Sequence, residues 1–345
     1  MRIAILSGHW SANVGNFYFQ RPIQWLLDDL LGADVSFAFD GPSVWSPRLK
    51  DPLSLTRALD TDLLILSGPI LGSRYLQSIL EDILSLKARG PDIAFLSAGL
   101  ENYTDSGASQ AAAQINAIEP LCVLTRDEPT AQRIESLVDV RVEAGMCFSA
   151  FLPESVHPLA EMRGLEDSIY VNFDPGTHPQ NLDSLTDEFP ASPHALPRPL
   201  IHASTIQFPS SGSMFTFLGR LQRTMRAIGF RDDYEKAYQQ MDFYSDNPYT
   251  VLSLINATGG TISNRVHTCA AALAFGKRAR YVKNSSRSTD GRFALLAGFG
   301  ARNIDQESVQ LNLKRPSQPK TSGQLDLQVR HHQHSLYLHH LSPLT

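Results

Sequence analysis

The stretch Asp62-Leu-Leu-Ile-Leu-Ser-Gly-Pro69 is a short apolar run that ends in a turn of small residues. Apolar residues then return every three or four positions over 75–87, which is the spacing of an amphipathic helix. A second apolar run, Asp92–Leu96, follows and ends in the turn Ser97-Ala-Gly99. A strand, a helix and a strand in this order predict a β-α-β unit with parallel strands. The stretch therefore indicates an α/β fold.

The same alternation extends through the first half of the chain. Four further apolar runs flank segments with helical spacing, and these runs lie at 2–6, 35–39, 121–125 and 138–142. The helical segments between them are 20–31 and 128–137. We therefore expect a parallel sheet covered on both faces, in a Rossmann-like domain over residues 1–150. In such sheets ligands bind at the carboxyl ends of the strands.

A second set of strands and helices is expected after residue 165. The strand candidates lie at 167–174, 200–206 and 279–282, and the helix candidates at 215–228, 234–241, 247–256, 265–275 and 291–298. This pattern predicts a second Rossmann-like domain over 165–310. Residues 311–345 are polar and rich in histidine, and we expect this tail to be mobile or loosely docked.

Composition excludes several classes of function. The chain of 345 residues has 30 basic and 35 acidic residues, so its net charge of −5 gives no general attraction to nucleic acid or to an anionic membrane. The first apolar run is too short for a signal peptide and no run approaches the length of a membrane span, so a cytoplasmic protein is expected. The three cysteines, Cys122, Cys147 and Cys269, are too widely spaced for a zinc knuckle and are expected to be buried or free thiols.

No metal site and no cofactor are expected. The tail holds five histidines without carboxylate or cysteine partners at a useful spacing: His331, His332, His334, His339 and His340. The first turn, 7–16, contains glycine and asparagine but lacks the spacing of a dinucleotide-binding loop and has no P-loop lysine. Asn13, Gly15 and Asn16 in this turn are still candidates for contact with a ligand.

The segment Ile262-Ser-Asn-Arg-Val-His-Thr268 is the strongest candidate for a binding site. It predicts a helix over about 265–275 that is capped by Asn264 or Ser263 and ends at Gly276 in the left-handed conformation. Arg265, Val266 and His267 then lie in the first turn, where the helix dipole attracts anions. The segment predicts a site for a phosphate or carboxylate beside a group that can transfer a proton. The alternative is an arginine paired between domains and an interior histidine.

A second candidate is Arg126-Asp127-Glu128, at the end of one predicted strand and the start of a helix. Asp127 and Glu128 are ordinary residues for a helix start, so capping explains them as well as catalysis does. The positive charge of Arg126 is unfavourable beside the positive end of the helix dipole. Arg126 is therefore expected to bind a ligand or a partner. Gly68 and Glu101 follow other strands and are candidates for contact with the substrate, Glu101 with sugar hydroxyls.

The chain resembles the polysaccharide pyruvyl transferase family. The resemblance is carried by Asn13-Val-Gly-Asn16, by Arg126-Asp-Glu128 and by Arg265-Val-His267 at the start of an alanine-rich helix. It extends over about residues 3–300 and is thin between 150 and 240. The chain departs from the family pattern at two places. The family has an acidic residue where this chain has Phe17, and it often has an aspartate-proline turn where this chain has residues 144–148.

This resemblance implies two Rossmann-like domains with mainly parallel sheets facing a cleft, the GT-B architecture. It implies a transferase that moves a pyruvyl group from phosphoenolpyruvate onto two hydroxyls of a sugar, which forms a ketal and releases phosphate. Arg126 and Arg265 would hold the donor, His267 would act as the acid, and Asp127, Glu128 or Glu101 would assist deprotonation. The acceptor would be a lipid-linked or nucleotide-linked precursor of a bacterial polysaccharide, met in the cytoplasm or at the inner membrane face.

Two other functions fit the same residues. A nucleotide-sugar-dependent GT-B glycosyltransferase also needs glycine turns at strand ends and a basic helix start for a diphosphate. A catalytically inactive homologue that binds a ligand would keep the fold while departing from the family pattern. Fold alone does not decide between these functions, because function resides in the site.

Overall fold

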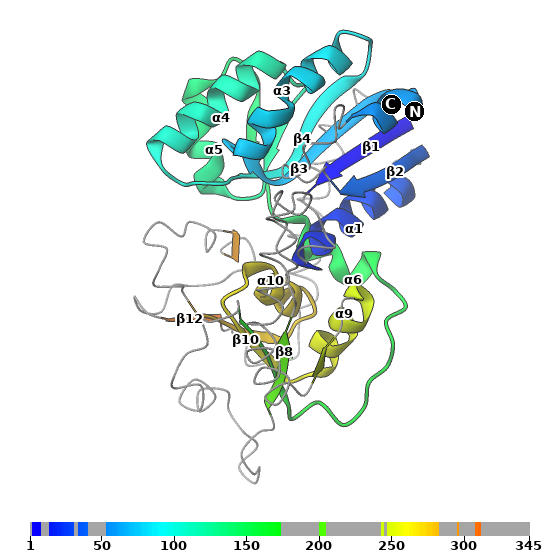
Figure 1. The fold of residues 1–345 in the computed structure, drawn as a ribbon. Coiled ribbons are helices and arrows are strands. Elements are labelled where there is room, and N and C mark those ends of the chain that lie inside the picture. Colours follow the sequence, from blue (N-terminus) through cyan, green and yellow to red (C-terminus); the bar gives the residue numbers. More distant parts are fainter. Residues whose placement is uncertain are drawn as a thin grey trace, which may run out of the picture.

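A computed structural model describes residues 2–7, 14–30, 34–40, 53–173, 200–204, 243–244, 247–282, 295–296 and 308–311. These residues form two Rossmann-like domains, each built on a mainly parallel sheet (Figure 1). The strand order is β2-β1-β3-β4-β5-β6 in the first sheet and β12-β11-β10-β7-β8-β9 in the second. The predicted fold class is therefore confirmed. Within the described residues, no helix is long and apolar enough to cross a membrane.

The first sheet is entirely parallel. Its strands are β1 (Arg2–Ser7), β2 (Asp34–Asp40), β3 (Leu63–Leu71), β4 (Asp92–Leu100), β5 (Val123–Thr125) and β6 (Val142–Ala144). The helices of this domain are α1 (Phe17–Trp25), α2 (Ser54–Ala58), α3 (Arg74–Lys87), α4 (Asp105–Ile118) and α5 (Glu128–Ile134). Short helical segments are η1 (Val14–Asn16), the π-helix η2 (Leu26–Leu30) and η3 (Glu135–Leu137).

Both faces of the first sheet are buried, because side chains alternate between them along each strand. Ile3 and Ile5 of β1 pack in the apolar cluster that includes α1, whereas Ala4 and Leu6 pack in the cluster that includes α3, α4 and α5. The three helices α3, α4 and α5 lie together on one side of the sheet and α1 lies on the other (Figure 1). This double cover explains why the strands read as continuous apolar runs.

The second sheet is parallel except for one edge strand. Its strands are β7 (Ile169–Asn172), β8 (Leu200–Ser204), β9 (Phe243–Tyr244), β10 (Gly260–Ser263), β11 (Arg278–Val282) and β12 (Ser308–Leu311), and β12 is antiparallel to β11. The helices α9 (Pro248–Ala257) and α10 (Val266–Ala274) precede and follow β10. The order of strands reverses between β7 and β10, so their carboxyl ends form the switch point at which ligands bind in such sheets.

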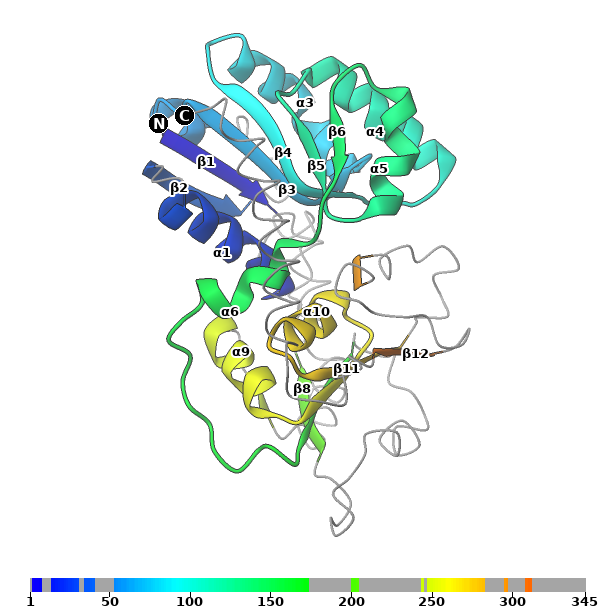
Figure 2. The same cartoon turned by 180° about the vertical axis from the view of Figure 1, so that it is seen from behind.

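One apolar cluster extends across both domains. It joins α1 to the connection formed by η4 (Phe148–Phe151) and α6 (Leu152–Ser155), and it continues into α9 and α10 of the second domain. Figure 2 shows α6 and α10 side by side where the domains meet. The start of α10 therefore lies at the junction of the domains, just after strand β10 of the second sheet.

Several predicted elements differ from the structure. The strands β3 and β4 extend beyond the predicted ends at residues 66 and 96, and the predicted strand 138–142 is displaced to β6. The helix α4 was not predicted. The helix predicted over 20–31 is observed as α1 followed by η2. The helices predicted over 215–228 and 234–241, most of the one over 291–298, and residues 312–345 lie outside the described residues.

Candidate functional site between the two domains

The carboxyl end of β3 and the start of α10 both pack against one aromatic ring. The Phe19 ring of α1 packs at 5.1 Å, centroid to centroid, from the His267 ring. A Cβ atom on Gly68 of β3 would lie 2.8 Å from the end of the same Phe19 ring. Gly68 also has a φ of +86°, a conformation that favours glycine. Phe19 thus connects the carboxyl end of β3 in the first sheet with the start of α10 in the second domain.

Arg265 is the N-cap residue of α10, which corrects the prediction that Asn264 or Ser263 caps this helix. The Ser263 hydroxyl accepts a hydrogen bond from the backbone N–H of Arg265 at 2.9 Å, and it donates one to the backbone oxygen of Asn172. Ser263 therefore joins the carboxyl ends of β10 and β7 to the start of the helix. Gly276, with a φ of +70°, ends the helix as predicted.

The functional groups at the start of α10 are largely covered. Arg265 and His267 are each 9% exposed, and Val266 is 4% exposed. Val266 and His267 are the first two residues of the helix, where the helix dipole and a guanidinium group together favour an anion. The position is therefore the one predicted, although the residues lie deeper than a surface turn would place them.

Two tyrosines from different domains lie near Arg265. Tyr18 of α1 and Tyr170 of β7 are both fully buried, and the positive charge of Arg265 acts on both phenol groups. The Tyr170 hydroxyl accepts a hydrogen bond from the side-chain amide of Asn172 at 3.1 Å. Burial raises the pKa of Tyr170 to about 12, and that of Tyr18 well above its ordinary value. Both hydroxyls therefore stay protonated at neutral pH.

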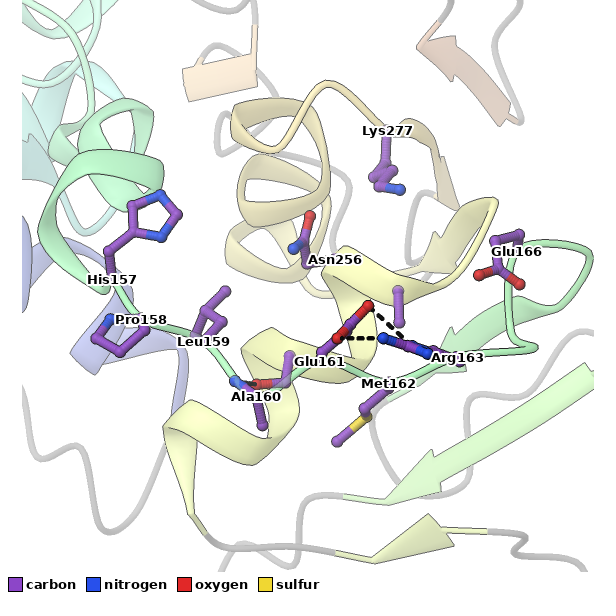
Figure 3. Close-up of a pocket in the computed structure, with 12 residues that line it drawn as sticks. His157, Pro158, Leu159, Ala160, Glu161, Met162, Arg163, Glu166, Asn256 and Lys277 are labelled. Carbon is purple, nitrogen blue, oxygen red and sulfur yellow. Dashed lines mark hydrogen bonds and ion pairs between the residues drawn. The ribbon is translucent and has the colours of Figure 1, made fainter.

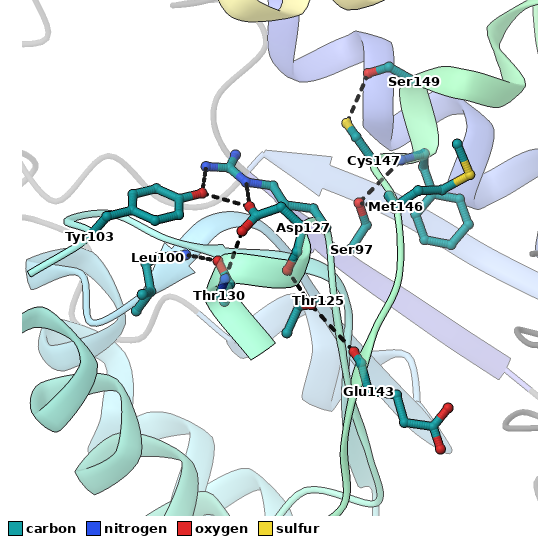
Figure 4. Close-up of polar contacts among 12 residues, drawn as sticks. Ser97, Leu100, Tyr103, Thr125, Asp127, Thr130, Glu143, Met146, Cys147 and Ser149 are labelled. Atoms are coloured by element: carbon teal, nitrogen blue, oxygen red, sulfur yellow. Dashed lines mark hydrogen bonds and ion pairs between the residues drawn. The ribbon is translucent and has the colours of Figure 1, made fainter. Parts of the chain in front are cut away.

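Arg126 and Asp127 form a second buried cluster, at the carboxyl ends of β4 and β5 (Figure 4). The Tyr103 hydroxyl donates to Asp127 at 2.6 Å and accepts from an Arg126 guanidinium nitrogen at 3.4 Å. Asp127 also accepts from the backbone N–H of Thr130 at 2.8 Å and so caps α5. Its two carboxylate oxygens are therefore both engaged within the domain.

The Arg126 side chain is 3% exposed and occupies space that only a glycine leaves open. A Cβ atom on Gly99 would lie 2.0 Å from Nε of Arg126. Burial lowers the pKa of Arg126, but Tyr103 and Asp127 outweigh this effect and raise the pKa, so the guanidinium stays charged. Burial also raises the pKa of Tyr103. The cluster is a fixed cation held by Tyr103, which follows β4, and by Asp127, which lies between β5 and α5.

The remaining predicted residues lie in more varied surroundings. Glu128 is exposed and accepts a hydrogen bond from the side chain of Gln132 at 2.9 Å. Glu101 is exposed and accepts from the backbone N–H of Arg74, the first residue of α3, at 3.4 Å. Gly15 and Asn16 lie in η1, directly before α1, whereas Asn13 lies outside the described residues.

Arg126 and Arg265 therefore lie in two clusters, each with neighbours of its own. Sequence reasoning missed Tyr18, Phe19 and Tyr103, which hold these clusters together. The signal for the first two was present in Phe17-Tyr-Phe19, three consecutive aromatic residues directly before the helix predicted over 20–31. The three cysteines are free and buried, in agreement with expectation. The described residues contain no group of three or more side chains suited to a metal ion.

A cavity of about 380 Å³ lies away from both clusters, where the segment 157–166 between the domains crosses α9 (Figure 3). Its lining includes Asn256 and Lys277 from the second domain. The side chains of Glu161 and Arg163 pair with each other at its edge, at 2.9 and 3.0 Å. The backbone N–H of Ala160 donates to the Ser253 hydroxyl at 3.1 Å and holds the segment against α9. Sequence analysis did not predict a site here.

Solved structures are similar to this chain at low sequence identity. No family model matches the chain, and no curated protein matches it. Among solved structures, it is similar to UDP-GlcNAc 2-epimerase from Methanocaldococcus jannaschii in complex with UDP-GlcNAc and UDP, with 9% identity, a TM-score of 0.46, and coverage of 81% of this chain and 83% of that one. It is similar to UDP-GlcNAc 2-epimerase from Neisseria meningitidis bound to UDP-GlcNAc, with 10% identity, a TM-score of 0.45, and coverage of 87% and 86%.

A functionally uncharacterised protein from Klebsiella pneumoniae has 12% identity and a TM-score of 0.44, with coverage of 86% of this chain and 87% of that one. The expected membership of the pyruvyl transferase family is wrong, since neither a family model nor a curated protein supports it. The predicted transfer of a pyruvyl group from phosphoenolpyruvate depended on this family membership and is therefore wrong as well. The short motifs that carried the resemblance include Asp127, whose place here is explained by capping and ion pairing.

Proposed function

We propose that the protein is a nucleotide-sugar-dependent enzyme that binds the diphosphate of its substrate at the start of α10, between the two domains. The observation that carries this proposal is the position of Arg265. It is a nearly buried arginine at the start of a helix, beside the switch point of a parallel sheet, and the next residue, Val266, packs in the apolar cluster that both domains share. A diphosphate has the charge and the size to use the guanidinium and the helix dipole together.

The chemistry of the substrate explains why a charged group is useful here. When the bond between a sugar and a nucleoside diphosphate breaks, negative charge develops on the departing phosphate oxygen. A preorganised arginine and a helix N-terminus stabilise that charge more strongly in a site that excludes water. His267, two residues after Arg265, is placed to hold or transfer a proton close to the same group.

Phe19 supports the role of His267. The Phe19 ring is 1% exposed and packs against the imidazole, so it limits the orientations that this side chain can take. Because Phe19 belongs to the first domain and His267 to the second, the orientation of the imidazole depends on how the domains pack. We expect catalysis to depend on the packing of the domains for this reason.

Calorimetric titration with UDP and UDP-GlcNAc tests the proposal. The wild-type protein is expected to bind both, and Arg265→Gln to weaken binding by roughly 10- to 100-fold, since a charged hydrogen bond to phosphate contributes about 1.5–3 kcal/mol. Arg278→Gln is the matched control, because Arg278 is an exposed arginine at the start of β11. Thermal unfolding of both variants checks that they fold. Equal affinity of Arg265→Gln and wild type would overturn the assignment of the site.

A second assay addresses catalysis. Release of nucleoside diphosphate is measured for a panel of UDP-sugars and GDP-sugars, with and without sugar acceptors. Turnover that falls in His267→Ala by roughly 10²- to 10⁴-fold, with binding of UDP retained, supports a role of His267 in proton transfer. Binding without turnover across the panel supports instead the alternative of an inactive ligand-binding homologue.

A further inference from the structure

The first turn of α1 packs against α9 and α10 of the second domain. The Phe17 ring packs edge-on against Tyr249 of α9 at 5.2 Å, and the Phe19 ring packs against His267 of α10 at 5.1 Å. Tyr18 lies between these two residues in sequence and is fully buried in the apolar cluster that crosses the junction. Three consecutive aromatic residues therefore anchor the first domain at the edge where α10 begins.

The Tyr18 hydroxyl is an anomaly in this packing. It is buried, and within the described part of the chain no group hydrogen-bonds to it. The Tyr170 hydroxyl, in the same cluster, is also buried but has the Asn172 amide as its partner. A buried hydroxyl without a partner lowers stability, so each such group in a folded protein calls for an explanation. A phenylalanine in place of Tyr18 would keep the ring and avoid the cost.

The surroundings of the hydroxyl indicate what it can meet. Tyr18 directly precedes Phe19, whose ring packs against His267 in the first turn of α10, and the positive charge of Arg265 acts on the Tyr18 phenol. Burial raises the pKa of Tyr18 well above its ordinary value, so the group is a protonated hydroxyl and can donate a hydrogen bond. A neutral donor beside a guanidinium and a helix N-terminus complements an anion.

We infer that Tyr18 is a further ligand-binding residue, whose hydroxyl donates a hydrogen bond to the same phosphate that Arg265 and the start of α10 hold. This inference rests on the proposed function for the location of the anion. Because Tyr18 belongs to the first domain and Arg265 to the second, one phosphate contacts both domains. Because the hydroxyl is covered in the structure, binding includes a small shift of α1 relative to α10 that opens a path to it.

The test compares Tyr18→Phe with wild type in two measurements. Without ligand, the melting temperature of Tyr18→Phe is expected to equal or exceed that of wild type, because the variant removes only an unpaired buried hydroxyl. With ligand, its affinity for UDP and for inorganic pyrophosphate is expected to fall by roughly 10-fold or more. Tyr249→Phe is the matched control at the same junction, since Tyr249 is 42% exposed, and it is expected to change neither measurement.

Each outcome decides the matter. Unchanged affinity of Tyr18→Phe for both probes overturns the inference, and a lower melting temperature overturns its premise that the hydroxyl has no structural partner. If wild type binds pyrophosphate but not UDP, the nucleotide-sugar function fails while the pyrophosphate comparison still decides the role of Tyr18. If wild type binds neither probe, both the proposed anion site and the role of Tyr18 are overturned.

Discussion

Replacing Asp127 by alanine is expected to destabilise the first domain by about 4 kcal/mol. The side chains of Asp127 and Arg126 are 0% and 3% exposed, and Nε of Arg126 lies 3.5 Å from the carboxylate. Breaking a buried ion pair from one side costs about 3–5 kcal/mol, because it leaves an uncompensated charge. Loss of the helix cap, in which the Thr130 N–H donates to the Asp127 carboxylate, contributes about 1 kcal/mol. The loss of the ion pair and the loss of the cap overlap in part, so their costs do not simply add.

Urea unfolding followed by far-UV circular dichroism measures this cost. The neighbouring substitution Glu128→Ala is the matched control, because Glu128 is exposed, and it is expected to cost less than about 0.5 kcal/mol. Adding Arg126→Met to Asp127→Ala removes the unpaired cation and is expected to recover about 2 kcal/mol. A cost below about 1 kcal/mol for Asp127→Ala would contradict a structural role of the carboxylate.

Three further perturbations probe the junction and the core. Phe19→Ala removes a ring that is 1% exposed and is expected to cost about 3–5 kcal/mol in unfolding free energy, and to change the NMR chemical shifts of the His267 ring. Gly99→Ala places a Cβ atom 2.0 Å from Nε of Arg126 and is expected to cost at least about 1–3 kcal/mol by urea unfolding. Burial raises the pKa of Cys122 from 9.0 to about 11. The part of the unfolding free energy that depends on protonation of this thiol is therefore fully present below pH 9.0 and is lost as the pH rises through 11. Urea midpoints across this range should therefore fall less for Cys122→Ala than for wild type, and equal falls would contradict the assignment.

The β-α-β alternation was readable from the sequence because both faces of the first sheet are covered. Such strands form continuous apolar runs, and the helix over 75–87 has a clear apolar face of Leu76, Ile79, Ile83 and Leu86. The helix α4 was missed because its buried face is largely alanine and glycine, which carry little periodic signal. These small residues allow close packing: a Cβ atom on Gly72 would lie 2.6 Å from the backbone oxygen of Gly107.

The candidate site was predicted in part. The position of Arg265 and His267 at a helix start follows from local signals, namely a polar cap region before the helix and Gly276 after it. The partners of these residues do not follow from local signals, because Tyr18 is about 250 positions away in sequence and is brought to the junction by the packing of two domains. Tyr103 was missed as the partner of Asp127 because the two residues are 24 positions apart and are brought together by the pairing of β4 with β5.

The family resemblance failed because it rested on short motifs. Asp127 and Glu128 are typical residues for a helix start, and an arginine beside them has a structural partner in this fold. Motifs of three residues at the ends of strands are shared by many α/β proteins for such reasons. Their spacing along the chain indicates the architecture, whereas the substrate depends on side chains that the fold brings together.

A structure of the protein with UDP-GlcNAc bound locates the phosphates directly. We expect both phosphates to lie at the start of α10, within hydrogen-bonding distance of the Arg265 guanidinium and between the two domains. Phosphates bound instead in the cavity beside 157–166, or at any position that touches neither Arg265 nor the first turn of α10, would contradict this expectation.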